Sequence, residues 1–249
     1  MKPLDLSNFI NLDAILAKPS RSRIALVGIE LEGAWRKLPN GTRLIRDGSL
    51  DRWECPPDVP DRRTHQGELP SPPLDPKDVS MFMKTFYPHY VHESCGMHVH
   101  MSFKNALCYS RCMDERYPST VVHYLKQWAE EEKFPSKHHF WDRLNGKSPY
   151  CQLYYQAEEQ IKNTMKDHDQ RRQGHRYTFI AYHYARFGTI ECRGLPMMET
   201  VEQAIRGVQR LQDITNGYLV ATAKKEPWLS ASMVVSDEVK AQERRLVLS

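Results

Sequence analysis

Cysteine, net charge and long apolar runs are all scarce in this sequence of 249 residues. The six cysteines are scattered, and a chain of this length can bury a core without disulfides, so we expect reduced thiols. A formal net charge of +4 does not by itself indicate a nucleic-acid partner. No apolar stretch is long enough to cross a bilayer, and the first residues lack the apolar run of a secretory signal. We therefore expect a cytoplasmic protein that binds neither nucleic acid nor a membrane.

The chain has no internal repeat, and we interpret it as one catalytic domain with two flanking segments. Residues 1–22 are expected to form an N-terminal extension, with the packed domain starting near Arg23. Residues 23–222 form the domain, and the polar residues 223–249 form a C-terminal tail. A chain of this length fits a single domain with a substantial core.

Apolar periodicity predicts an α+β fold. Alternation and turn residues predict strands at 24–32, 95–103, 177–183 and 189–193, and a hairpin of Trp35–Leu38 with Thr42–Ile45 around Asn40-Gly41. Helical spacing predicts helices at 12–17, within 77–90, at 118–134, at 148–166 and from 200 onward. Residues 55–76 hold seven of the 16 prolines, so we expect them to be mostly irregular.

The predicted strand at 95–103 has two chemically different faces. Its alternation places His98, His100 and Ser102 on one side and four apolar side chains on the other. If the apolar side is buried in a core, two imidazoles and a hydroxyl line up on the opposite side. This arrangement is typical of a functional site.

Two other predicted strands carry carboxylates in the same way. Glu30 and Glu32 share one face of their strand, and Glu191 shares a face with Arg193, while Glu68 lies on a proline-flanked segment. Neighbouring carboxylates in a sheet repel one another unless a cation lies between them. Oxygen ligands with one or two imidazoles favour Mg²⁺ or Mn²⁺ over zinc. The pattern therefore predicts a site for divalent cations.

Arg193 extends this prediction toward phosphate chemistry. Its planar guanidinium matches phosphate oxygens, so it suits a phosphate that bridges the predicted cations. Metal ions, an arginine and a cleft over a sheet are the parts of a phosphoryl-transfer site. The sequence has no Walker-type glycine loop, so a nucleotide would be held by a different arrangement.

Four motifs occur in the order seen in amidoligases, which are small carboxylate–amine ligases of the glutamine synthetase superfamily. They are Gly28–Gly33, Gly67–Leu69 with Ser71-Pro72-Pro73, Cys95–Ser102 and Thr189–Arg193. The Gly-Met-His-Val-His-Met-Ser stretch also resembles glutamine synthetase itself. The resemblance spans about residues 24–222. It implies a curved, mainly antiparallel sheet, backed by helices, that forms a funnel for Mg²⁺ and ATP.

The resemblance also implies roles for single residues. The implied metal ligands are Glu30, Glu32, Glu68, His98 and Glu191. His100 and Ser102 resemble contacts to the nucleotide, and Arg193 resembles the arginine that neutralises the transferred phosphate. Arg176 is similar to an arginine that binds phosphate or the substrate carboxylate. Asp47 resembles an amine-binding aspartate of glutamine synthetase, although that element precedes the Glu-x-Glu strand there and follows it here.

We therefore expect an ATP- and Mg²⁺-dependent ligase that forms an amide or isopeptide bond through an acyl phosphate. A guanidino-kinase-like phosphotransferase that stops at the phosphorylated product is one alternative. A zinc-stabilised, non-catalytic binding protein with Cys95, Cys108 and Cys112 as ligands is another. The identities of the carboxylate and amine substrates, and the oligomeric state, stay open.

Overall fold

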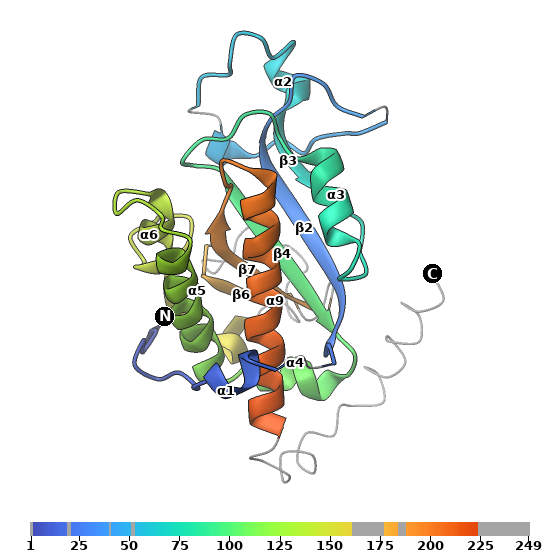
Figure 1. The fold of residues 1–249 in the computed structure, drawn as a ribbon. Helices are drawn as coiled ribbons and strands as arrows, with labels where there is room; N and C mark the ends of the chain where they lie inside the picture. Colours follow the sequence, from blue (N-terminus) through green and yellow to red (C-terminus); the bar gives the residue numbers. More distant parts are fainter. Residues whose placement is uncertain are drawn as a thin grey trace.

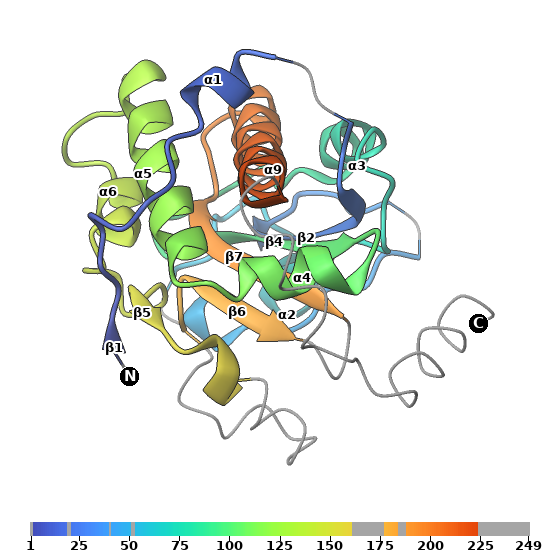
Figure 2. The same ribbon diagram turned by 90° about the horizontal axis from the view of Figure 1, so that it is seen from below.

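A computed structural model of the chain describes residues 2–18, 21–39, 41–50, 53–160, 177–183 and 188–223. Its centre is a five-stranded sheet in the order β3-β2-β4-β7-β6, in which every neighbouring pair is antiparallel. Helices α3, α5 and α9 cover one face of this sheet (Figures 1 and 2). The mixed α+β class predicted from periodicity is confirmed.

The strands and helices have the following bounds. The central strands are β2 (Ile24–Ala34), β3 (Gln66–Pro70), β4 (Gly96–Phe103), β6 (Ile180–His183) and β7 (Thr189–Pro196). Strands β1 (Lys2–Pro3) and β5 (Tyr154–Tyr155) form a separate two-stranded sheet. The helices are α1 (Asp13–Leu16), α2 (Arg62–His65), α3 (Val79–Phe86), α4 (Ala106–Cys112), α5 (Arg116–Glu131), α6 (His139–Leu144) and α9 (Val201–Ala223), with a 3₁₀ turn η1 (Gly48–Leu50).

The two faces of the central sheet differ as the alternation predicted. Ile29 and Leu31 of β2, Val99 of β4 and Ile190 of β7 are buried in one apolar core. Each such side chain contributes about 1.5–3 kcal/mol by leaving water. This core leaves the other face of the sheet to the acidic and imidazole side chains.

Helix α9 supplies much of the core on the covered face. Its inward positions Ala204, Val208, Leu211 and Ile214 are fully buried, at the spacing that predicted the helix. The Thr200 hydroxyl accepts a hydrogen bond from the Gln203 N–H and so caps the start of the helix. No described helix combines the length and the apolar character that a membrane crossing needs.

Packing begins before Arg23, earlier than we expected. Leu4 and Leu12 belong to the same core, and the Leu12 N–H donates a hydrogen bond to the Tyr124 hydroxyl of α5. Leu12 also lies against Gly217 of α9, where the missing side chain leaves room for it. The residues around α1 therefore pack against α5 and α9. At the other end, residues 224–249 of the predicted tail lie outside the described residues.

The hairpin predicted around Asn40-Gly41 is wrong for the described residues. Gly41 makes a turn, with φ of +81°, but Ile45 forms a bridge with Glu68 of β3. The Trp35 N–H donates to the His65 carbonyl instead of to a returning strand. Gly41 therefore marks a turn, as predicted. Ile45, after this turn, pairs with the open edge of β3 and not with Trp35–Leu38.

Residues 55–76 are mostly irregular, as predicted, except for Arg62–Pro70. Residues Gln66–Pro70 form β3 at the edge of the sheet, preceded by α2. Prolines are tolerated on edge strands because one side of such a strand needs no ladder hydrogen bonds. Pro70 ends this strand, so the prolines flank it and do not prevent it.

The helix predicted at 148–166 does not begin at Ser148. Gln152 bridges Thr178, and the following residues form β5. Helical backbone starts at Ala157, and residues 161–166 lie outside the described range. Helices α4 and α6 were not predicted, because seven and six residues are too short to show a clear helical period.

Candidate metal centre

The strand register brings the predicted ligands together on the face of the sheet opposite α9. Three cross-strand pairs form this arrangement: Glu30 with His98, Glu32 with Glu68, and His100 with Glu191. A shift of one residue in any strand would send its polar side chains into the apolar core. The buried apolar face therefore fixes the position of the polar one.

His98 lies at the centre of these side chains and is only 3% exposed. Its Nδ1 is 3.0 Å from Glu30 Oε2 and 3.5 Å from Glu191 Oε1. Its Nε2 is 3.6 Å from Glu32 Oε1. Both ring nitrogens thus face carboxylate oxygens, which come from β2 on one side and β7 on the other.

Three overlapping groups in the described ranges have ligand atoms within 4.8 Å of one another. The groups are Glu30, His98 and Glu191; Glu32, Glu68 and His98; and His100, His183 and Glu191. We call these seven side chains the acidic cluster. The first two groups contain all five residues that the sequence predicted as metal ligands.

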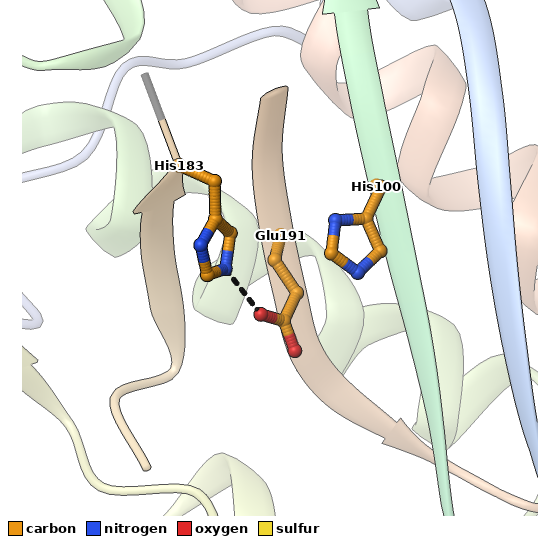
Figure 3. Close-up of side chains that lie close together, drawn as sticks. All are labelled: His100, His183 and Glu191. Atoms are coloured by element: carbon orange, nitrogen blue, oxygen red, sulfur yellow. Dashed lines mark hydrogen bonds and ion pairs between the residues drawn. The ribbon is translucent and has the colours of Figure 1, made fainter. Parts of the chain in front are cut away.

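Two members of the acidic cluster were not among our predicted metal ligands: His100, which we predicted as a nucleotide contact, and His183. His183 Nε2 is 2.6 Å from Glu191 Oε2, while His100 flanks Glu191 from the other neighbouring strand (Figure 3). Ala181 of β6 pairs with Glu191, so His183, two residues further on, points to the same face. The alternation of side chains along the predicted strand at 177–183 is the signal that could have identified His183.

Burial and mutual repulsion set the electrostatics of the carboxylates. Burial and the charges of Glu30 and Glu32 raise the pKa of Glu68 to about 8. Burial also raises the pKa of Glu32. Burial would raise the pKa of Glu30 as well, but hydrogen bonds with His100 and His98 lower it to about 2. The charged form of Glu30 is therefore favoured, whereas burial favours the neutral forms of Glu32 and Glu68.

Arg193 balances the charge of Glu191, and one of its own donors is buried without a partner. Burial would raise the pKa of Glu191, but the Arg193 guanidinium and a hydrogen bond with His183 hold it well below its usual value. Arg193 Nη1 donates to Glu191 Oε1. Arg193 Nε is buried and has no hydrogen-bond partner among the described residues. Leaving such a donor unpaired costs about 1–3 kcal/mol.

A bulge in β7 accompanies the placement of Arg193. Val99 of β4 pairs with Cys192, but Met97 pairs with Leu195, so β7 carries one extra residue in this interval. Bulges bend a strand and re-aim its side chains, and they are common next to active sites. The extra residue lets the side chains of Cys192 and Leu195 both stay in the core while Arg193 faces the acidic cluster.

Arg143 of α6 hydrogen-bonds to the backbone at this bulge and lines the same small cavity as Glu32 and Arg193. Its Nη1 donates to the Arg193 carbonyl at 3.1 Å, and its Nη2 donates to the Cys95 carbonyl at 3.3 Å. It is buried, and its charge favours the ionised form of Glu32. Nothing in the sequence around Arg143 distinguished it from a surface arginine, so we did not predict it.

The other predicted site residues differ in position. Asp47 lines a small cavity together with Glu32 and Arg193, so the structure brings it to the acidic cluster. The Ser102 hydroxyl accepts a hydrogen bond from the Leu26 N–H at 3.1 Å and lies outside the three groups. Arg176 lies outside the described residues.

The cysteines proposed as zinc ligands are not brought together. Cys95 precedes β4, whereas Cys108 and Cys112 lie on α4, which follows it. The eight residues of β4 span about 26 Å at the usual rise of a strand. In the part of the chain that the structure describes, none of these thiols belongs to a metal-capable group.

Comparisons with protein-family models, with curated proteins and with solved structures each found no match to this chain.

Proposed function

We propose that the protein is an ATP- and Mg²⁺-dependent ligase that joins a carboxylate to an amine. The observation that carries the proposal is the convergence of four carboxylates on His98, beside a buried arginine with an unpaired donor. The order of the amidoligase-like motifs along the chain supports it. The funnel-shaped, glutamine synthetase-like form of the sheet is part of the same proposal.

The donor set fits divalent cations. Carboxylate oxygens with an imidazole nitrogen suit Mg²⁺ or Mn²⁺, and a cation would favour the charged form of Glu68. The residues that would hold the cations are Glu30, His98 and Glu191 in one group, and Glu32 and Glu68 with His98 in the other. Bound cations would offset the negative charge of the nucleotide phosphates.

In this proposal, Arg193 binds the transferred phosphate. Glu191 accepts a hydrogen bond from one nitrogen of the Arg193 guanidinium, and Arg143 donates a hydrogen bond to the Arg193 carbonyl. The Arg193 guanidinium is therefore oriented before a ligand arrives. A donor fixed in advance costs no reorganisation when charge develops on the phosphate. His100, hydrogen-bonded to Glu30 on the next strand, would lie on the nucleotide side of the same face.

The chemistry requires an activated acid because the charge of a free carboxylate repels a nucleophile. Transfer of the terminal phosphoryl group of ATP to a carboxylate oxygen gives an acyl phosphate and ADP. The amine nitrogen then attacks the acyl carbon, the bond to the phosphate oxygen breaks, and inorganic phosphate leaves. Asp47 lines the cavity beside Glu32, and in this proposal it holds the amine and accepts the proton that the amine loses.

The test is ADP release by the full chain, measured with acidic amino acids and ammonium as probe substrates. We expect release that depends on Mg²⁺ and on both probes, with an amide product detected by mass spectrometry. Glu191→Gln should lower the rate by about 100-fold or more, because it removes a ligand and the partner of Arg193. Glu131→Gln, on the helical side of the sheet, is the matched control. A stable phosphorylated product without an amide would support the kinase alternative, and full activity of Glu191→Gln would contradict the proposed site.

A further inference from the structure

Gly96 begins β4, two residues before His98, and the fold leaves no room for a side chain there. A Cβ atom at this position would lie 2.8 Å from His98 Nε2 and 3.3 Å from both Nη atoms of Arg143. A Cβ atom essentially never comes within 3.0 Å of another heavy atom. Gly96 is not one of the glycines with a positive φ, so its backbone conformation suits other residues as well. The space around it, and not its conformation, therefore requires glycine.

The two neighbouring side chains are held in place and cannot move away cheaply. His98 and Arg143 are each 3% exposed. His98 Nδ1 is held 3.0 Å from Glu30 Oε2 on the far side of the ring. Arg143 donates hydrogen bonds from Nη1 and Nη2 to two backbone carbonyls. Rotation of either side chain would therefore break a contact between buried polar groups.

The backbone at Gly96 is also held in place. The Cys95 carbonyl accepts a hydrogen bond from the Met197 N–H at 3.1 Å, and the Cys95 N–H donates to the His92 carbonyl at 2.9 Å. The Gly96 N–H donates to Glu32 Oε2 at 2.6 Å, and Glu32 is only 3% exposed. Any shift of this backbone would therefore turn the Glu32 carboxylate as well.

We propose that Gly96 is a positioning residue for the cation-binding group of Glu32, Glu68 and His98. Because Gly96 has no side chain, the His98 ring can lie between Glu30 and Glu32, with a nitrogen facing each carboxylate. Its N–H binds Glu32 Oε2 and so leaves Oε1 to face the ring. A larger residue would displace either the ring or the Glu32 carboxylate, and both belong to this group. The inference rests on the cation binding of the proposed function and not on the ligase chemistry.

The test is Mn²⁺ binding to the full chain with Gly96→Ala, measured by electron paramagnetic resonance of the free ion. We expect the affinity to fall about tenfold, because residues that orient metal ligands typically contribute about 10–100-fold. Gly207→Ala on α9 is the matched control. A Cβ atom there would lie 3.0 Å from Trp128, in the core on the helical side of the sheet, so this variant crowds the fold away from the acidic cluster. Wild-type affinity in Gly96→Ala overturns the proposal, as does an equal loss of affinity in Gly207→Ala.

A second measurement does not depend on metal. Thermal melting with a chelator gives the loss of melting temperature that Gly96→Ala causes in the wild type and in a chain that already carries His98→Ala. Since His98→Ala removes the ring that the added methyl group would contact, we expect the loss to be smaller in that chain. Equal losses overturn the proposal, even where Gly96→Ala is too unstable for a binding measurement. Absence of Mn²⁺ binding in the wild type would overturn the cation binding of the proposed function, and the two melting losses would still decide whether Gly96 positions His98.

Discussion

Glu68 should destabilise the metal-free protein near neutral pH, so Glu68→Gln should stabilise that form. Glu68 pairs with Glu32 across β2 and β3, and burial together with neighbouring carboxylates raises its pKa from 4.5 to about 8. A group with a higher pKa in the folded state binds more protons when folded than when unfolded. The free energy of unfolding therefore falls as the pH rises from about 4.5 to about 8.

The size of this effect follows from the pKa of Glu68. At 1.36 kcal/mol for each pH unit, the change from 4.5 to about 8 corresponds to at most about 5 kcal/mol. Glu30 and Glu32 share the repulsion, and Glu68 is partly exposed, so the recoverable part is smaller. We expect Glu68→Gln to raise the free energy of unfolding by about 1–3 kcal/mol at about pH 8, or the melting temperature by about 3–9 °C.

Thermal unfolding in the presence of a chelator, at about pH 5 and about pH 8, measures this difference. The wild type should lose stability between the two values, and Glu68→Gln should lose less. Mg²⁺ should then raise the melting temperature of the wild type more than that of the variant. Glu131→Gln, an exposed carboxylate on α5, should follow the wild type throughout. A Glu68→Gln protein that is less stable than the wild type at pH 8 without metal would refute the crowding of these carboxylates.

Three further predictions concern residues whose roles the sequence did not indicate or indicated only weakly. Arg143→Lys should lower the free energy of unfolding in urea by about 1–3 kcal/mol, because the compact ammonium group of lysine lacks the rigid planar fork that donates to the Arg193 and Cys95 carbonyls. Equal stability of the variant and the wild type would show that these hydrogen bonds do not stabilise the fold. His183→Gln should weaken Mn²⁺ binding in calorimetry by about tenfold and Mg²⁺ binding less, since an imidazole favours the transition metal; equal losses would remove His183 from the ligand set. Leu12→Ala should cost about 2–4 kcal/mol in urea unfolding and the exposed Leu6→Ala less than about 1 kcal/mol, because only Leu12 is buried in the core; similar costs would show that the first residues do not pack as described.

The faces of β2, β4 and β7 could be predicted from the sequence because alternation assigns each side chain to one side of a sheet. Burial of Ile29 and Val99 on one face left Glu30 and His98 together on the other. The ordering of the strands and their register could not be predicted in this way. They depend on contacts with α5 and α9, which are distant in the sequence.

Residues on short or proline-flanked elements were harder to place. The prolines around Glu68 led us to predict an irregular segment where the structure has an edge strand. An edge strand tolerates prolines because one of its sides needs no ladder hydrogen bonds. Arg143 lies on a helix of six residues, and only the packed structure shows that its guanidinium donates a hydrogen bond to the backbone at the bulge of β7. His183 followed the alternation of its strand, but its partner Glu191 became evident only from the pairing of β6 with β7.

The proposed function depends most directly on the binding of divalent cations to the acidic cluster. Titration of Mn²⁺ into the metal-free full chain, followed by electron paramagnetic resonance, measures the free ion and so the number bound. We predict at least one Mn²⁺ bound per chain, displaced by Mg²⁺, with binding lost in Glu30→Gln and Glu191→Gln and retained in Glu131→Gln. Mn²⁺ binding that is absent in the wild type, or unchanged in both acidic-cluster variants, would contradict the account.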